Sequence, residues 1–401
     1  MNIKYKKNIV LLYAYTFFDG FILAYVIERL FWAARGMSIT MVVATEIIYG
    51  ISVAVFELPS GLLADKFGRK KLLIVAGFLA VIEMILIYNA HSFWWFAAAV
   101  FLGGISTAME SGSLQAIMYD SLSSVGKQDN YEAVYGRFRA IDTAGSVIAA
   151  FLGAFTAYTI GMELNYQISI GSKFAAFILL LFLTEVSTGA RKDMKEGLTL
   201  RGYYKEVRAF FKNNRMLSLY CMNGLVLGAC WNYVDEFWQL LMQEVDVPVF
   251  YFGAILVLYS IFTIPGNLLV QRLKRKINYT LFFGLIPFLY GGGFILIGHL
   301  RSYLVLLPLI SLGIWHGFVE PLLSGCIQHR TKSSVRATME SVFSFMLRIV
   351  SVFVGLLFSL YADHSIFKGY QVLGAIALGF GIFNCICILM VVKKQKMSDI
   401  K

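Results

Sequence analysis

Charged residues are scarce in this chain of 401 residues, where they make up 15% of the total against 58% hydrophobic residues. A typical soluble domain contains about 25% charged residues. The composition therefore excludes an ordinary soluble domain, and it indicates that lipid surrounds most of the chain.

Cysteine and histidine are also few, with five residues of each. The cysteines lie inside apolar runs without zinc-finger spacing, which indicates small buried side chains rather than metal ligands. The sequence has no His-x-x-x-His pattern, no nucleotide-binding glycine loop and no supported Ser/His/Asp order. We expect no metal, no cofactor and no enzymatic activity.

A cleavable signal peptide is lacking as well, so the basic segment 1–7 is expected to remain as a cytoplasmic tail. The formal net charge of +11 would suggest a nucleic-acid partner in a soluble protein. Here the bases lie in the segments between apolar runs, so they indicate membrane topology and no nucleic-acid binding.

Twelve apolar runs are long enough to cross a bilayer as helices of about 20 residues. They are approximately 8–34, 38–64, 71–90, 93–121, 133–161, 164–187, 214–242, 247–270, 277–298, 301–328, 335–362 and 367–392. An even number places both termini on one side, and most of the 35 Lys and Arg residues fall on that side. The positive-inside rule predicts a multi-pass protein of the cytoplasmic membrane with cytoplasmic N- and C-termini.

The long polar segment 188–213 divides the spans six and six. We therefore expect an N-terminal six-helix bundle at 1–187, a cytoplasmic linker at 188–213 and a C-terminal six-helix bundle with a basic tail at 214–401. Apolar residues recur at helical spacing in the linker, which predicts an amphipathic helix on the membrane surface. Short matches between the halves at near-constant offsets favour an internal duplication.

One stretch, 61–71, places an acid, two glycines and four bases between two apolar runs, which predicts a short loop at the membrane edge. A basic hairpin that only fixes topology would give the same charge pattern. The order Gly-x-x-x-Asp-Lys-x-Gly-Arg-Lys is more specific. It resembles the loop between the second and third helices of major facilitator superfamily (MFS) transporters, most of all bacterial drug and small-molecule exporters.

This resemblance implies an all-α membrane protein with twelve transmembrane helices in two pseudo-symmetric six-helix bundles, which rock around a central cavity as a monomer. It also implies a conformational latch at the inner side, in which an acid caps the eleventh helix and an Arg pairs with an acid of the fourth helix. The matching residues here are Gly61, Asp65, Gly68, Arg69, Lys70 and Asp120. A solvated acid at a helix end is the alternative interpretation of Asp120.

Several ionisable residues lie inside the apolar runs, where a charge costs several kcal/mol unless it faces a partner or a water-filled cavity. The main candidates for the proton-coupling and substrate cavity are Asp19, Glu110, Asp142, Asp235, Glu236, Glu320 and Arg348. Satisfied structural ion pairs, such as Asp19 or Glu320 with Arg348, are the alternative. Glu83 is the weakest candidate, because the resemblance places the third helix at the edge of its bundle.

Acids outnumber bases in this set, and the resemblance places aromatic residues beside them, among them Trp231 and Trp315. Acids with aromatic faces suit hydrophobic cations, although many aromatics must face lipid. The expected partners are a small-molecule substrate, protons and the lipid bilayer. Asp19 and Glu320, followed by Glu110, are the preferred proton carriers.

The function that follows is secondary active transport by alternating access, with proton-coupled efflux of a hydrophobic or cationic small molecule of the drug or antibiotic type. The fifth span departs from the drug-exporter pattern, because its spaced glycines at 145 and 153 come without proline. A proton-coupled importer of a sugar, peptide or siderophore is therefore an alternative. A non-transporting membrane sensor or a lipid-handling enzyme is the second alternative.

Overall fold

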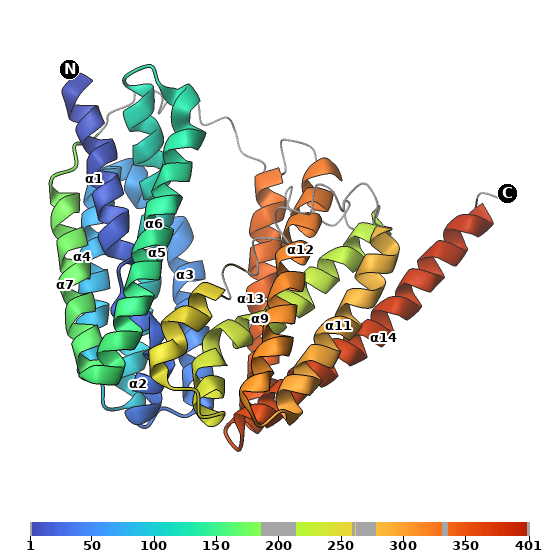
Figure 1. Cartoon of the computed structure of the whole chain (residues 1–401). Helices are drawn as coiled ribbons and strands as arrows, with labels where there is room; N and C mark the ends of the chain where they lie inside the picture. The colour runs from blue at the N-terminus through green and yellow to red at the C-terminus, as the bar shows by residue number, and fades with distance from the viewer. Residues whose placement is uncertain (1, 186–213, 259–260, 262–277, 331–335, 399–401) are drawn as a thin grey trace. The chain divides into compact units, whose positions relative to one another are not determined.

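The computed structural model describes residues 2–185, 214–258, 261, 278–330 and 336–398. Every regular element in these ranges is a helix (Figure 1). The α-helices of the first half are α1 Asn2–Gly20, α2 Glu28–Ala34, α3 Ile39–Phe67, α4 Arg69–Tyr88, α5 Phe93–Ser123, α6 Tyr131–Thr159 and α7 Met162–Leu181. Those of the second half are α9 Arg215–Glu244, α11 Tyr279–His299, α12 Leu306–Arg330, α13 Arg336–Ala362 and α14 Ile366–Ser398. Short 3-10 helices lie at η1 Leu23–Val26, η2 Gln128–Asn130, η3 Val249–Tyr251 and η4 Tyr303–Val305.

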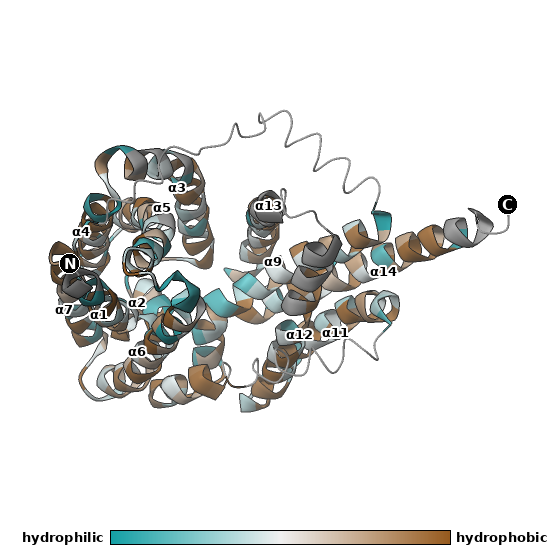
Figure 2. Ribbon diagram, turned by 90° about the horizontal axis from the view of Figure 1, so that it is seen from above, coloured by the Kyte–Doolittle hydropathy of each residue, from teal (hydrophilic) through white to brown (hydrophobic). Residues whose placement is uncertain are grey.

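Nine helices within the described ranges are long and apolar enough to cross a membrane, and 249–258 and 303–319 form shorter apolar helices. Figure 2 shows hydrophobic residues, in brown, on helices of both halves of the chain. The predicted span 214–242 is also helical, as α9. The chain is a multi-pass membrane protein. The predicted linker helix at 188–213 lies outside the described residues, so the predicted domain boundaries stay predictions.

The chain forms two compact units, Met1–Met194 with Pro248–Leu256, and Lys195–Val247 with Val257–Lys401. In the first unit α1 packs on α6 and α7, α4 packs on α5 and α7, and α3 packs on α5. One cluster of buried side chains joins five of these helices: Leu12, Leu73, Ile117, Phe138 and Leu180. In the second unit α11 packs on α14 and α12, and α9 packs on α13 and α14.

The first predicted span, 8–34, is not one continuous helix. It consists of α1, which ends at Gly20, then η1 and then α2. The expectation of an unbroken helix was wrong. The sequence gives no sign of the break, because the run contains no proline and its apolar pattern continues through it. Non-helical backbone inside a membrane is tolerated only where the protein supplies partners for it.

The stretch 61–71 is helical on both sides of a single turn residue, which corrects the expectation of a loop. Helix α3 continues through Pro59 to Phe67, and α4 begins at Arg69. The turn residue Gly68 has φ 97°, a conformation that glycine adopts without strain. Pro59 does not end the helix, because neighbouring residues are tied to α5: the Ser60 hydroxyl donates to the Ala108 carbonyl at 2.8 Å.

Candidate functional site

A buried ion pair lies where the first span breaks. Lys173 on α7 donates from Nζ to Oδ1 of Asp19, in the last turn of α1, at 2.6 Å. Their side chains are 11% and 26% exposed. Inside a span each of these two charges needs the other, because removing either partner leaves an uncompensated charge.

A second carboxylate meets α1 one turn earlier. Tyr15 and Asp19 are four residues apart, so they lie on the same face of the helix. The Tyr15 hydroxyl donates to Glu110 Oε1 on α5 at 2.8 Å, and Tyr15 is 3% exposed. Glu110 is partly buried. The structure thus brings Asp19 and Glu110, two of the predicted site residues, to one face of α1.

The third acid of this group is Asp142 on α6, which packs against α1. Its carboxylate accepts from Arg139 at 3.2 Å, three residues earlier on the same helix. One turn beyond Asp142, the Ser146 hydroxyl donates to the Gly20 carbonyl at 3.2 Å. The Arg139 side chain is 62% exposed, so this pair is weaker than the buried one.

The charges of this cluster do not balance when all groups are ionised. Asp19, Glu110 and Asp142 carry three negative charges, whereas Lys173 and Arg139 carry two positive charges. Coulombic interactions link the Glu110 carboxylate to Asp19, Lys173 and Asp142. Among the described residues, Glu110 is the acid of this group that forms no ion pair. The cluster therefore has room for one more cation, either a proton or a charged ligand.

Polar side chains replace the helical hydrogen bonds that the break in the first span removes. Most come from one face of α7, at positions 165, 169 and 172. The bonds run from Asn165 Nδ2 to the Leu23 carbonyl (3.1 Å), from the Ala24 amide to Ser169 Oγ (3.0 Å) and from Ser172 Oγ to the Phe18 carbonyl (2.6 Å). The break is thus a built feature that fixes Asp19 next to Lys173.

The spaced glycines of the fifth span serve this same arrangement. A Cβ atom at Gly145 would lie 2.8 Å from the Phe17 carbonyl oxygen, and one at Gly153 would lie 2.5 Å from the Leu23 carbonyl oxygen. Glycine at both positions lets the backbone of the first span pass close to α6. The structure therefore gives these glycines a packing role without the missing proline.

At the predicted inner end, the guanidinium of Arg69 contacts the carboxylate of Asp120, as the resemblance implied. Asp120 is 8% exposed, so it is not a solvated helix-end acid. Gly61 lies within α3 and Gly68 forms the turn. The side chain of Asp65 lies outside the described residues. The latch function of this group is untested and stays a proposal.

Glu185, just after α7, caps the start of α4. Its carboxylate accepts from the backbone amides of Arg69 at 3.1 Å and Lys70 at 2.8 Å. A carboxylate at a helix N-terminus satisfies free N–H groups and interacts favourably with the helix dipole. This contact ties the Gly68 turn to the end of the sixth span.

In the second unit, the predicted aromatic residue Trp231 is buried on α9 and stacks on His316 of α12, with ring centroids 4.5 Å apart. The Tyr290 hydroxyl lies 3.2 Å from His316 Nδ1. Trp315 points elsewhere, against Phe318, with centroids 6.0 Å apart. Trp231 and Trp315 therefore belong to two different aromatic contacts.

The remaining predicted charges of this unit are spread over three helices. Asp235 is exposed and Glu236 partly exposed on α9, and Arg348 is exposed on α13, where it forms no ion pair with any described residue. Glu320 lies on α12, but its side chain is outside the described residues. In the part of the second unit that the structure describes, no acid cluster matches that of the first.

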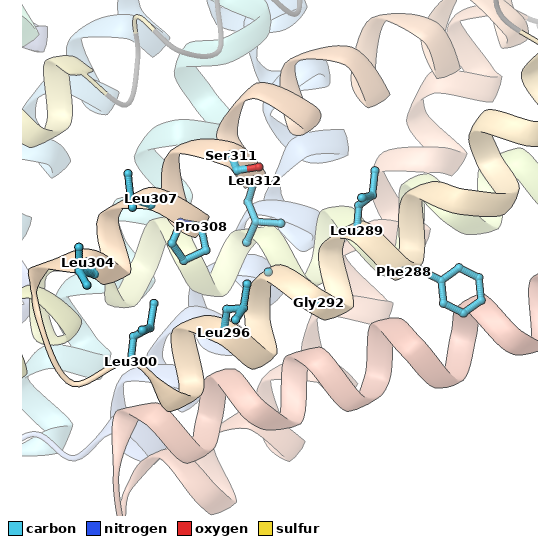
Figure 3. Close-up of a pocket in the computed structure, with 11 residues that line it drawn as sticks. Phe288, Leu289, Gly292, Leu296, Leu300, Leu304, Leu307, Pro308, Ser311 and Leu312 are labelled. Carbon is cyan, nitrogen blue, oxygen red and sulfur yellow. The ribbon is translucent and has the colours of Figure 1, made fainter.

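A groove of about 560 Å³ lies between α11 and α12 (Figure 3). Leucines, Phe288 and Pro308 line it, and Ser311 supplies its one polar side chain. Such a surface offers no group that binds a cation or a proton. The groove is therefore not the predicted polar site.

Sequence reasoning missed Lys173 and Glu185 in this arrangement. It also missed Arg29, whose separate ion pair joins it to Glu46 at 2.9 Å. Lys173 also corrects the expected pairing of Asp19 with Arg348. The signal was present, because a lone base inside an apolar run is as costly as a lone acid.

Two curated relatives are similar to this chain at low sequence identity. An uncharacterized transporter of Buchnera aphidicola subsp. Acyrthosiphon pisum is 27% identical over 173 residues, which is 43% of this chain and 42% of that protein. The aligned part thus spans less than half of that relative. A second uncharacterized transporter, from Buchnera aphidicola subsp. Baizongia pistaciae, is 20% identical over 86% of both chains.

Solved structures share the fold over nearly the whole length. The nucleoside transporter NupG superimposes with a TM-score of 0.73 at 14% identity, over 98% of this chain and 99% of that one. A bacterial homolog of the human lysosomal transporter Spinster gives 0.72 at 13% identity over 97% of both chains. A D-xylose-proton symporter gives 0.66 at 13% identity, over 96% of this chain and 97% of that one.

The sequence profile described as Major Facilitator Superfamily matches residues 9–356, which is most of the chain. Together with the solved neighbours it confirms the all-α fold expected from the stretch 61–71, and it points to a transporter rather than an enzyme. The chain therefore belongs to the Major Facilitator Superfamily.

Proposed function

We propose that the chain is a proton-coupled secondary transporter in which Glu110 binds the coupling proton. The observation that carries this proposal is the charge of the α1 cluster: Lys173 pairs with Asp19 and Arg139 pairs with Asp142, while Glu110 has, among the residues that the structure describes, only the neutral Tyr15 hydroxyl as a partner. A carboxylate inside a span that lacks a fixed cation is well suited to take up and release a proton.

Exchange of a proton for a cationic small molecule follows from this arrangement. A proton and a cationic ligand would each neutralise the single excess negative charge, so they compete for one site. Competition between two ligands for one site, which opens to each side by turns, gives antiport. The proposed cargo is a hydrophobic or cationic small molecule that is exported as protons enter.

Import with protons is the second candidate. It is favoured by the solved neighbours, which include a nucleoside transporter and a D-xylose-proton symporter. In that case the Asp19 and Lys173 pair would offer hydrogen-bond acceptors and donors to a polar, uncharged cargo, and protonation of Glu110 would precede cargo binding.

Purified protein in liposomes tests the proposal, with ethidium as the cationic probe and an imposed proton gradient. The wild-type protein and the control Asp129→Asn, at an exposed position in η2, are expected to move ethidium against the proton flow. Glu110→Gln is expected to remove the dependence on the gradient.

Four outcomes would contradict the proposal. Ethidium flux that ignores the gradient, or that keeps its gradient dependence in Glu110→Gln, would remove Glu110 as the proton site. Accumulation of a labelled nucleoside or sugar in the direction of proton entry would favour import. Liposomes that move no solute but modify a lipid would favour an enzyme.

A further inference from the structure

Glu83 is a carboxylate inside a span that the proposed proton site does not use. It lies on α4, partly buried, and its carboxylate faces α5 at Gly103. A Cβ atom at Gly103 would overlap this carboxylate, so glycine lets the carboxylate occupy this position. Within the described ranges Glu83 forms no ion pair. An acid in this position is costly unless it is protonated or acquires a cation.

Lys173 is a cation that interacts electrostatically with Glu83. Coulombic interactions link Glu83 to Lys173 on α7, to Glu28 on α2 and to Asp19 on α1. Helix α7, which carries Lys173, packs on both α1 and α4. Lysine has a flexible four-carbon stem and a compact ammonium group, so it can change partner with little movement of the backbone.

We propose that Lys173 alternates between two carboxylates, Asp19 and Glu83, and that the Glu83 position beside Gly103 is a second protonation site of the transport cycle. This inference rests on the proposed proton coupling. The structure then represents one of two arrangements, in which Lys173 neutralises Asp19 and Glu83 carries a proton.

The second arrangement follows from charge balance. When Glu83 releases its proton to water, it becomes a carboxylate and attracts the Lys173 ammonium, which keeps its three protons. Asp19 then loses its counter-ion and takes up a proton from water or a cationic cargo. Coulombic interactions also link Lys173 to Glu110 on α5 and to Tyr25 in η1. The Glu110 charge therefore acts on the same ammonium and couples the two sites.

The exchange would also act on the backbone, because Asp19 lies in the last turn of α1 before the break. Release of Lys173 leaves that helix end held by Ser146 and Ser172, which bond to the carbonyls of Gly20 and Phe18. Protonation or deprotonation of Glu83 would thus change the contacts at the end of α1, because Lys173 pairs with Asp19 only while Glu83 is protonated.

Infrared spectroscopy of the purified protein tests the exchange without any transport. The carboxylic-acid band of a protonated Glu83 is expected in the wild type and lost in Glu83→Gln. In Asp19→Asn, Lys173 is free to pair with Glu83, so the band is expected to fall at the same pH. In the double variant Asp19→Asn with Lys173→Met, no cation is left for Glu83 and the band is expected to return.

The controls separate this effect from misfolding. Gly171→Ala, where a Cβ atom meets nothing within 4 Å, is expected to leave the band unchanged. An Asp19→Asn protein that elutes as a folded species yet keeps the full band would overturn the exchange. Because this readout needs no cargo, such a result would leave the proton role of Glu110 standing.

Transport gives a second measurement that does not depend on Asp19 variants. Gly103→Ala displaces the Glu83 carboxylate while it leaves every charge in place, so it is expected to change the pH profile of ethidium transport in the same way as Glu83→Gln. Profiles of both variants that match the wild type would also overturn the inference.

Discussion

The contact between Arg69 and Asp120 shows what one charge pair contributes at a helix junction. Asp120 is nearly buried near the end of α5, and Arg69 is the first residue of α4 after the Gly68 turn. The pair joins α4 to α5, while Glu185 holds the backbone of the same turn. Arg69 therefore both forms an ion pair and begins helix α4.

Charge reversal at this pair is expected to show that the two residues act together. Arg69→Asp or Asp120→Arg alone leaves two like charges near each other, at an expected loss of about 3 kcal/mol in unfolding free energy. The double reversal is expected to recover a large part of that loss. Thermal unfolding of the detergent-purified variants measures it, and equal losses in all three variants would contradict the pairing.

The division of the first span into α1, η1 and α2 is the main feature at the scale of elements. The polar face of α7 supplies the partners that the break requires, and Gly145 and Gly153 of α6 let the backbone approach. The sequences of α6 and α7 do not reveal the break, because isolated Ser and Asn residues in an apolar run can also pack against an unbroken helix.

Loss of one of these partners is expected to destabilise the protein. Asn165 donates to the carbonyls of Leu23 at 3.1 Å and Gly153 at 2.9 Å, and it is fully buried. Asn165→Leu leaves both carbonyls without that donor, so the expected loss is about 1–3 kcal/mol. The matched control is Asn89→Leu, where the amide is exposed and bonds within its own helix.

Thermal unfolding in one detergent compares the two leucine variants. A lower midpoint for Asn165→Leu than for Asn89→Leu is expected. If the midpoints coincide, the α7 polar face does not support the break.

For the whole molecule, the charge distribution of the sequence predicts a topology with both termini in the cytoplasm. Three exposed positions at helix ends or between helices test it: Ser92, Thr159 and Lys127. A membrane-impermeant thiol reagent on intact cells is expected to label Ser92→Cys and Thr159→Cys. It is expected to label Lys127→Cys only after the cells are permeabilised. The opposite pattern would reverse the topology.

The sequence predicted the fold and the acids of the candidate site, but not the partners of these acids. Apolar runs set the spans, and the spacing from Gly61 to Lys70 led to the family and to the Arg69 contact with Asp120. The partners of Asp19 and Glu110 could not be predicted, because Lys173 and Tyr15 reach them through the packing of α7 and α1. Charge type along a span shows that a partner is needed, but only tertiary structure shows which one.

The break in the first span also constrains how the nascent protein is made. Ala24 and its partner Ser169 are 145 positions apart, so at about 5–20 residues per second the ribosome inserts the first span roughly ten seconds before the sixth. Until then the Leu23 carbonyl and the Ala24 amide lack the side-chain partners that α7 supplies, and each missing partner costs several kcal/mol. The first span therefore reaches its final form only after the sixth arrives, and fragments that end before residue 165 are exposed to membrane quality control.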